Sequence, residues 1–594
     1  MSIARIVPGL TLSAILYYAV LAWLQASTHY SSDEIEWGPQ AEAILRRGAP
    51  VLEEGDWRFL VSPDSHVRQS GGRTYGLWHP PLYLMALAGH IAIFGASTKS
   101  VRLFGALCFL AALVLTGRLA RSLARRAGMQ PEPAALCGWL AVALLTVNPY
   151  AVQGSVFVDI DNTLLIPFQI LFFAAFFRWA ERASVHSALA VVVTIALMLW
   201  TKVTTPLILI ILAGGYLVFN GQRRAVFGFG ALTPVGAGLF LGTWWLYARA
   251  VGLPFEYPFV FTHAAKAGAL FGSSFFERLN AVRYAVTWIS FPLCLLWLVT
   301  IAGRAREVWR TWHLSPIDLV LLSSLAIFGF YGGLVGASGK YIVPAMPFLA
   351  LGIAWYITEA KILEGLRGRP GWTALGICIG VALLHVLVIP DILTHEFVPG
   401  RLPHTGFATA LIDPRLPRYA LALVPLVAAV IGLHLSTGKG HWLWALCAGA
   451  LVALAPANVV QNAALVRHKV VLSSTTTSGL DEVVAILNRE AKPDSVIVGR
   501  KDLQPLLTKG QLIPLDREIT WRWTYDEDLG AAKALSLFSR CPRAEFLVET
   551  IPSRFWGDPQ VRETLEKNFE PPVHIGSYRL LRRRPGLCAR PSPK

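Results

Sequence analysis

Residues 10–27 read LTLSAILYYAVLAWLQAS, and the acidic stretch YSSDEIEW follows at residues 30–37. About 20 consecutive apolar residues in a helix cross the hydrocarbon core of a bilayer. The apolar core of this run is longer than that of a typical cleaved signal, and only Arg5 precedes it. The sequence therefore predicts a retained first membrane helix, with Asp33 and Glu34 just beyond its end.

Similar apolar runs recur along most of the 594 residues. Hydrophobic residues make up 54% of the chain and charged residues 15%, and the mean hydropathy is +0.50. This composition is typical of a protein that crosses the membrane many times. The apolar runs are 7–27, 80–95, 101–117, 133–150, 162–179, 187–201, 205–219, 226–249, 284–303, 317–338, 341–359, 372–389, 419–436 and 441–464.

Arginine and lysine concentrate in six connections between these runs, and such connections usually face the cytoplasm. All six lie on one side only if residues 80–95 do not cross the membrane. That run is the shortest, carries His90 and begins with two prolines, so we interpret it as a non-spanning or re-entrant helix. About thirteen crossings remain, with a cytoplasmic N-terminus and an outside C-terminus. The connections are 118–126, 178–182, 221–224, 303–310, 361–369 and, weakly, 438–440.

The chain changes character near residue 465. Residues 1–464 form the predicted membrane domain, with a first outside loop at 28–79, and residues 465–594 form a predicted α/β domain outside the cytoplasm. In the tail, SGLDEVVAILNREA (478–491) has the pattern of an amphipathic helix capped by Ser478. DSVIVG, AEFLVE and HIGSYRLLRR have the pattern of strands. The predicted fold class is an all-α polytopic membrane protein with a C-terminal soluble α/β domain.

The formal net charge is +16. The basic residues lie between apolar runs and form no stripe interleaved with aromatics, so the charge predicts cytoplasmic loops and no nucleic-acid partner. The seven cysteines show no metal-finger spacing. Cys541 and Cys588 lie in the polar tail, where a disulfide and two free thiols both remain open.

Acidic residues recur on the predicted outer face. Asp33 and Glu34 could be a solvated helix boundary. Asp159 and Asp161 stand in VFVDIDN, at the outer entry to a later span. Carboxylates at membrane depth are costly and usually functional, although Asp161 could also cap its helix.

Cations occupy the same predicted face. His79 precedes Pro80 and Pro81 at the start of a helix, and Lys202 stands at the outer end of another. A lone lysine at a helix end often reaches toward headgroups. Several cations opposite several carboxylates instead indicate a site for a phosphorylated molecule, with a carboxylate as base for an attacking hydroxyl. The other cations of this set are His263, Lys266, Arg278 and Lys340, and Tyr341 follows Lys340 directly.

The order of these motifs resembles that of the lipid-linked-sugar glycosyltransferases of the GT-C type, especially the protein O-mannosyltransferases and the aminoarabinose transferases. The motifs are an Asp-Glu pair after the first span, His-Pro-Pro-Leu, an outward Asp, Thr-Lys at a helix end and Lys-Tyr-x-x-Pro-x-x-Pro. The resemblance covers about residues 1–360. It implies that Asp33 is the general base, supported by Glu34, and that the sugar donor is a polyprenyl phosphate sugar.

The same resemblance implies the roles of the remaining site residues. His79, Lys202 and the loop cations would face the lipid phosphate, and Tyr341 would face the donor. Two departures from the family pattern stand out. Lys340 replaces a common Arg, which weakens bidentate phosphate binding, and the presence of both Asp159 and Asp161 leaves the second acidic residue unassigned. We expect no metal, although the carboxylates could gather around an oxygen-preferring divalent ion.

Transfer would occur on the outer face of a bacterial inner membrane. It would join the sugar to a hydroxyl of a glycan, lipid or protein by a single inverting displacement. The main alternative is a polytopic transporter or a flippase for a lipid-linked or anionic substrate. A noncatalytic membrane scaffold is a third alternative, but it leaves the ordered motifs unexplained. The sequence identifies neither the sugar nor the acceptor.

Overall fold

The structure is a computed structural model, and it places its residues in two compact units. Unit 1 comprises Met1–Trp23, Leu77–Tyr83 and Arg102–Val466, and unit 2 comprises Leu24–Gly76, Leu84–Val101 and Arg467–Lys594. Within them the structure describes residues 3–26, 28, 34–53, 73–74, 79–156, 160–256, 289–335, 339–365, 479–500, 503, 506–514, 544–550 and 559–585, and also 259, 275, 278–279, 282, 431, 448–451, 454, 458–459, 461–463 and 466.

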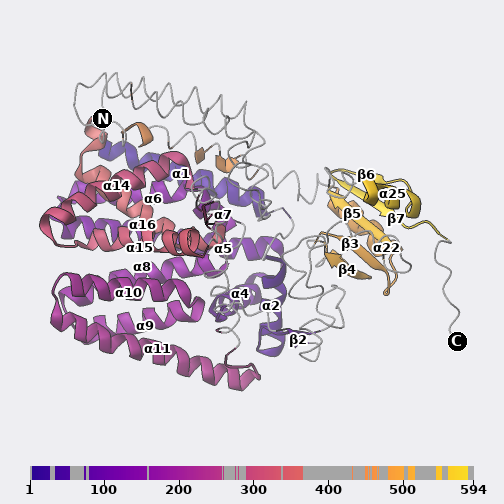
Figure 1. Cartoon of the computed structure of the whole chain (residues 1–594), viewed down its shortest axis with the longest axis horizontal. Helices are drawn as coiled ribbons and strands as arrows, with labels where there is room; N and C mark the ends of the chain where they lie inside the picture. The colour runs from indigo at the N-terminus through magenta and orange to yellow at the C-terminus, as the bar shows by residue number, and fades with distance from the viewer. Residues whose placement is uncertain are drawn as a thin grey trace. The chain divides into compact units, whose positions relative to one another are not determined.

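Unit 1 is built from long apolar helices that lie side by side (Figure 1). They coincide closely with the predicted apolar runs. Six described helices are long and apolar enough to cross a membrane, and the chain is a multi-pass membrane protein. The elements are α1 (Ile3–Ala26), α5 (Thr98–Arg126), α6 (Pro131–Thr146), α7 (Pro149–Val156), α8 (Ile160–Glu181), α9 (Val185–Thr201), α10 (Thr204–Phe219), α11 (Arg223–Val251), α14 (Phe291–Thr311), α15 (Pro316–Phe328), the π-helix η1 (Gly329–Leu334), the 3₁₀-helix η2 (Gly339–Ala345), α16 (Met346–Glu359) and α17 (Ile362–Gly365).

The predicted count of about thirteen crossings stays a prediction. The runs 372–389 and 419–436 lie almost wholly outside the described residues, as does most of 441–464. Three of the basic stretches are not loops, because α5 stays helical through residue 126, α8 through residue 181 and α14 through residue 311. Arginine is a good helix former, so a helix can continue through a basic stretch beyond its apolar part.

Several basic helix ends meet at one end of the bundle, which we call the basic end. Arg126, the last residue of α5, forms an ion pair with Glu181, the last residue of α8. Asn220, after α10, donates to the carbonyl of Leu314 at 2.8 Å and accepts from its amide at 2.9 Å. These contacts bring the ends of α5 and α8 together and join the end of α10 to the segment before α15. They agree with the prediction that the basic connections lie on one side of the membrane.

The direction of α1 follows from its contacts with α6 and α7. Thr11 donates a hydrogen bond to the carbonyl of Trp139, and Tyr18 donates one to Ser155 farther along the chain. Helix α1 therefore runs in the same direction as α6, away from the basic end, and antiparallel to α5. The chain leaves α1 and enters α5 at the same end, which agrees with a non-crossing helix at 80–95.

Helix α4 (Leu82–Phe94) is the apolar element between these two spans. Its 13 residues correspond to a length of about 20 Å, whereas the hydrocarbon core of a bilayer is about 30 Å thick. Its length is thus short for a transmembrane helix, and its non-spanning character remains our prediction.

A close crossing of α5 and α6 depends on two glycines. A Cβ atom at Gly138 would lie 2.8 Å from the carbonyl oxygen of Gly117, which is backbone and cannot turn aside. Small residues at such crossings let two membrane helices approach closely. Gly138 is therefore required for the distance between these helices.

We expect Gly138→Ala to destabilise the protein by about 1–3 kcal/mol, because the added methyl group must push the two backbones apart. Thermal unfolding of the purified protein in lipid measures this effect. Gly215→Ala is the matched control, since nothing lies within 4 Å of a Cβ at that position in α10, and alanine should leave stability unchanged or slightly raised. Equal melting temperatures for Gly138→Ala and wild type would contradict the close crossing.

Unit 2 contains α2 (Glu34–Arg47), the short antiparallel strands β1 (Leu52–Glu53) and β2 (Arg73–Thr74), most of α4, and a C-terminal α/β region. The C-terminal sheet has the order β4-β3-β5-β7-β6. Strand β3 pairs parallel with β4 and β5, whereas β7 pairs antiparallel with β5 and β6. The elements are α22 (Leu480–Glu490), β3 (Val496–Gly499), β4 (Gln511–Pro514), β5 (Phe546–Thr550), α25 (Pro559–Asn568), β6 (Val573–Ile575) and β7 (Tyr578–Arg582).

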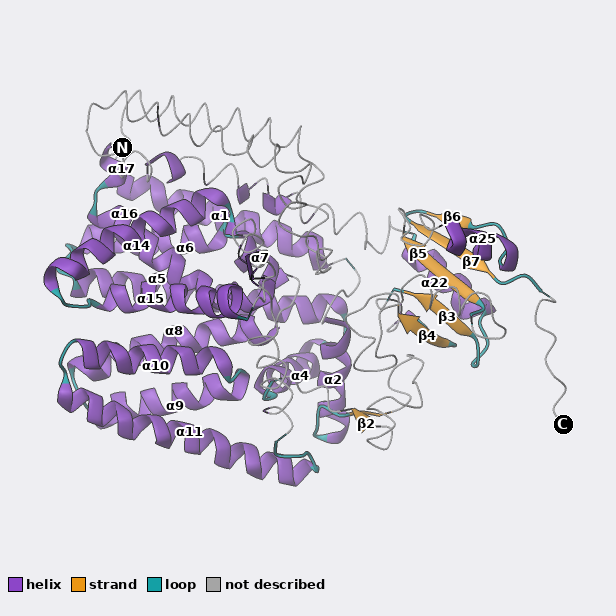
Figure 2. Cartoon of the chain, viewed as in Figure 1, coloured by secondary structure: helices purple, strands orange, loops and turns teal. Residues whose placement is uncertain are grey.

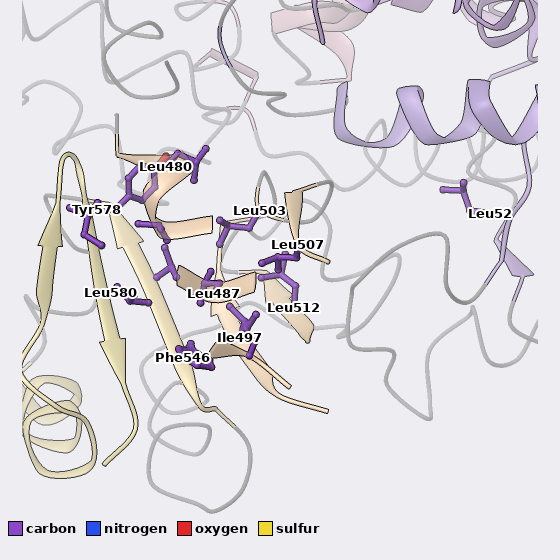
Figure 3. Packing of buried hydrophobic residues seen from close by; sticks show 14 of the residues in the cluster. Leu52, Leu480, Leu487, Ile497, Leu503, Leu507, Leu512, Phe546, Tyr578 and Leu580 are labelled. Carbon is purple, nitrogen blue, oxygen red and sulfur yellow. The ribbon is translucent and has the colours of Figure 1, made fainter. Parts of the chain in front are cut away.

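Both faces of this sheet are buried. Helix α22 packs Leu480 and Leu487 against Ile497, Phe546 and Leu580 on one face, in a common hydrophobic cluster (Figure 3). On the other face, the alternate strand residues are also fully buried, as expected for a sheet with parallel strands. Those residues are Val498, Leu547 and Leu581, and Val561 and Leu565 of α25 are buried as well. The predicted fold class, helical membrane domain plus C-terminal α/β region, is confirmed (Figure 2).

The predicted start of the tail helix is wrong by one residue. The N-cap of α22 is Gly479, not Ser478, and it makes no side-chain capping bond. Gly479 has a positive φ of 78°, and a Cβ there would lie 2.5 Å from the carbonyl oxygen of Ile575. Only glycine fits this close approach to the sheet, and a local capping pattern carries no information about such a tertiary contact.

One ion pair in this region links the end of α22 to the end of β7. Arg582 Nε lies 2.7 Å from Glu490 Oε2, and Nη2 lies 3.2 Å from Oε1. The hydrogen bonds from Arg582 hold the pKa of Glu490 below its usual value, although partial burial opposes the shift. A lowered folded-state pKa gives stability that is present above the unfolded pKa, near 4.3, and lost as pH falls through the lower folded value.

We therefore expect Glu490→Gln to lower hydrogen-exchange protection of β7 at pH 7 by about twofold to fivefold, the effect of about 0.5–1 kcal/mol. The difference from wild type should shrink as the pH falls below the unfolded pKa and vanish below the lower folded value. The matched control is Glu566→Gln, whose partner Arg562 lies on an exposed helix face. A difference that persists unchanged at low pH would contradict the ion-pair explanation.

Candidate functional site

Several elements of unit 1 meet at the end opposite the basic end, which we call the far end. Helix α7 touches η2 there, because a Cβ at Gly154 would lie 3.0 Å from a methyl group of Val343. Gln169 of α8 donates to the carbonyl of Pro344 at 2.6 Å. The carbonyl of Pro344 can accept this bond because a 3₁₀ turn with a proline leaves backbone groups without helical partners.

Lys202 stands at the corner between α9 and α10. Helix α9 ends at Thr201, and Lys202 is its C-cap in an extended conformation, with its amide donating to the carbonyl of Met198. The side chain is fully buried, and Nζ lies 5.2 Å from the centroid of the Tyr341 ring. A buried ammonium costs several kcal/mol in lost hydration, and an aromatic face returns about 2 kcal/mol or more when water is excluded.

Tyr341 lies in η2 and carries the second contact of this site. Its ring stacks on that of Tyr331 with centroids 5.4 Å apart and planes inclined by 18°. Tyr331 is fully buried in η1, and its hydroxyl lies 3.0 Å from the hydroxyl of Thr205 in the first turn of α10. A cation, two aromatic rings and a threonine hydroxyl thus form one continuous cluster at the far end.

Prolines explain the local backbone of η2. Pro344 lacks an amide hydrogen, which favours a short 3₁₀ segment over continuous α-helix. Pro347 is the second residue of the following helix α16, in the first turn, where proline is well tolerated. The Lys-Tyr-x-x-Pro-x-x-Pro motif is therefore a turn that presents Tyr341 and then starts a buried helix. Chemically, the cluster offers a fixed positive charge, suited to an anionic group such as a phosphate.

Comparisons with known proteins bear on this arrangement. Residues 78–245 match the family model for dolichyl-phosphate-mannose-protein mannosyltransferases, and this segment includes Lys202. The structure also resembles that of ArnT from Cupriavidus metallidurans bound to undecaprenyl phosphate, with a TM-score of 0.56 and 16% identity over 99% of this chain and 100% of that one. The chain has the GT-C fold. The resemblance inferred from the ordered motifs is thereby confirmed.

Two further solved structures resemble the structure of this chain. ArnT from the same organism in the apo state gives a TM-score of 0.50 with 16% identity, over 96% of this chain and 97% of that one. Arabinosyltransferase EmbB from Mycobacterium smegmatis gives 0.45 with 15% identity, over 79% of this chain and 41% of that one. No curated protein sequence matches the chain.

Of the residues predicted for the site, the structure brings together Lys202 and Tyr341. His79 is buried and stands immediately before Pro80 at the start of α4, and Arg278 is half-buried at a helical position. For three others only the backbone is described: Glu34 begins α2, Asp161 lies in α8 and Lys340 in η2. Asp33, Asp159, His263 and Lys266 lie outside the described residues.

The sequence prediction did not include Tyr331, Thr205 or Gln169. Each makes its contact with a residue more than 120 positions away, and no local pattern encodes such a partner. The available signals were weak: Tyr331 stands in the glycine-rich GFYGGL, and Thr205 precedes a proline at a helix start.

The expectation that the chain binds no metal stays a prediction, as does the alternative of a divalent ion held by the carboxylates. Within the described portion of the chain, no three His, Cys, Asp or Glu residues come close enough to hold a metal ion. The carboxylates that would form such a site in the sequence interpretation are those whose side chains the structure does not describe. The four Asp and Glu residues therefore keep their proposed roles without an assigned metal.

Proposed function

We propose that this protein is an integral membrane glycosyltransferase that moves a sugar from a polyprenyl phosphate donor to an acceptor hydroxyl. The observation that carries the proposal is the buried Lys202 ammonium over Tyr341, at the far end of a GT-C fold. The family match of residues 78–245 supports glycosyl transfer. The ArnT structure that this fold resembles contains undecaprenyl phosphate, which supports a lipid phosphate as ligand.

The lipid phosphate is the leaving group in the proposed reaction. The bond between the anomeric carbon and the phosphate oxygen breaks, and negative charge develops on that oxygen. Lys202 stabilises this charge, and a preformed cation in a water-excluded site does so more effectively than solvent. His79, His263, Lys266, Arg278 and Lys340 are proposed as further phosphate contacts, with Tyr341 facing the donor.

The acceptor hydroxyl forms the new bond to the anomeric carbon. Asp33 accepts its proton as general base, and Glu34 supports Asp33 or holds substrate. Asp159 or Asp161 supplies the second carboxylate. A single displacement inverts the configuration at the anomeric carbon, and the phosphate needs no protonation to leave.

We further propose the setting of this chemistry. The protein lies in a bacterial inner membrane, with its N-terminus in the cytoplasm and the far end of unit 1 outside. Residues 465–594 then form an extracytoplasmic domain attached to a membrane domain at 1–464. The acceptor is a glycan, a lipid or a protein hydroxyl, and neither nucleic acid nor a nucleotide sugar takes part.

Binding of the bare lipid tests the donor class. Purified protein in lipid should be stabilised against heat by polyprenyl phosphate but not by polyprenol of the same chain length, because only the phosphate meets Lys202. At a free concentration of about 100 times Kd, the stabilisation corresponds to about 2.7 kcal/mol. Equal stabilisation by both lipids would overturn the proposed phosphate site.

A further inference from the structure

The π-helix η1 contacts the proposed phosphate site through Tyr331, which stacks on Tyr341. It follows α15 directly, and the amide of Val335 donates to the carbonyl of Phe330 at 2.9 Å. This spacing of five residues is that of a π-helix, which widens the turn and often marks a functional site. Tyr331 lies inside this widened turn and is fully buried.

Tyr331 contacts both halves of the Lys202 cluster. Its ring stacks on Tyr341, the ring that lies beneath the Lys202 ammonium. Its hydroxyl meets that of Thr205, three residues after Lys202 on the same corner. The contacts therefore form a closed ring of neighbours: Lys202 contacts Tyr341, Tyr341 contacts Tyr331, and Tyr331 contacts Thr205. Thr205 follows Lys202 on the same corner of the backbone.

A closed ring of contacts restricts the conformations of the flexible Lys202 side chain. Lysine has four rotatable side-chain bonds and loses much entropy when it is fixed. Catalytic positioning requires a charged group to be held in place by neighbours whose own conformations are fixed by packing and hydrogen bonds. Tyr331 and Thr205 are both fully buried and supply such support from η1 and α10.

We propose that Tyr331 and Thr205 are positioning residues that hold Tyr341 and Lys202 in the geometry needed for the lipid phosphate. This inference rests on the proposed function. Neither residue is assigned contact with substrate or with the reacting atoms. They act through Tyr341 and through the corner that carries Lys202.

Four variants of the full-length protein test the pair. Tyr331→Phe and Thr205→Val each remove the hydroxyl contact, and each should weaken binding of polyprenyl phosphate by about threefold to tenfold. The double variant should be no weaker than either single one, because one shared contact is lost. Thr205→Ser keeps the hydroxyl and should bind like wild type.

Tyr216→Phe is the matched control, since Tyr216 is a buried tyrosine of α10 located beside Asn220 at the basic end. It should leave binding unchanged. Fully additive losses in the double variant, or losses equal to those of Tyr216→Phe, would overturn the positioning role.

A second readout needs no substrate. In wild type the buried Lys202 should react slowly with an amine-modifying ester, as followed by mass spectrometry of the peptide. Tyr331→Leu removes the stacked ring and should raise labelling of Lys202 at least fivefold, whereas Tyr216→Leu should not. Unchanged labelling in Tyr331→Leu overturns the proposed support. If labelling rises but wild type binds no polyprenyl phosphate, the positioning contact stands and the proposed function fails.

Discussion

Asp33→Asn is expected to reduce sugar transfer by about 1,000-fold while leaving donor affinity within about twofold of wild type. General-base catalysis contributes about 10² to 10⁴ in rate, and asparagine cannot accept the proton of the acceptor hydroxyl. The substitution preserves shape and hydrogen-bonding capacity, so it should not disturb the helix that follows. Single-turnover transfer and equilibrium binding, measured on the same preparation, separate the two effects.

Glu36→Gln is the matched control for Asp33→Asn. It removes one negative charge three residues farther along the chain, within α2. If Asp33 acts only through charge at a solvated helix boundary, the two variants should behave alike. Transfer by Asp33→Asn at the level of Glu36→Gln would exclude Asp33 as the base.

Lys202→Met is expected to lower kcat/KM for the lipid-linked donor by about 100-fold to 1,000-fold, the range found when a preorganised donor to a developing negative charge is removed. Methionine keeps much of the side-chain volume in a fully buried position. Thermal unfolding reports separately whether loss of the buried ammonium changes the stability of the fold. Steady-state kinetics and thermal unfolding of one preparation measure both effects.

Lys99→Met provides the control for Lys202→Met. Lys99 is an exposed lysine in the first turn of α5, and its loss should change kcat/KM by less than about twofold, as expected of a solvated surface charge. A lowered melting temperature in Lys202→Met, with unchanged kinetics, would show that the buried lysine stabilises the fold and does not serve transfer.

The membrane helices were predictable because each crossing requires a long apolar run. Apolar periodicity also located α22, β3, β5 and β7, although it missed α25 and β4. It also took HIGSYRLLRR as one strand, where the structure has the antiparallel strands β6 and β7 joined by a turn. The end of α9 at Lys202 followed from a change in composition. The opposite directions of α1 and α5 agree with the distribution of arginines. All six basic stretches lie on one side of the membrane if the helix at 80–95 does not cross it.

The contacts within the site were less predictable. The sequence indicates that Lys202 and Tyr341 lie on one face of the membrane, but not that the ammonium lies over the ring. Tyr331, which stacks on Tyr341, lies in a π-helix. A π-helix differs from an α-helix by a single hydrogen-bond shift and has no reliable sequence pattern. The N-cap of α22 was also unpredictable from local sequence. It is Gly479 and not the predicted Ser478, because the carbonyl of Ile575 lies against Gly479.

Turnover of a radiolabelled polyprenyl phosphate sugar by the purified protein in lipid tests glycosyl transfer most directly. With an acceptor extract, the wild type should release polyprenyl phosphate and place an equal amount of label in the acceptor, and Asp33→Asn should bind the donor without consuming it. A donor that stays chemically intact with every acceptor extract, or that only crosses the bilayer, would contradict a transferase and favour a flippase or transporter.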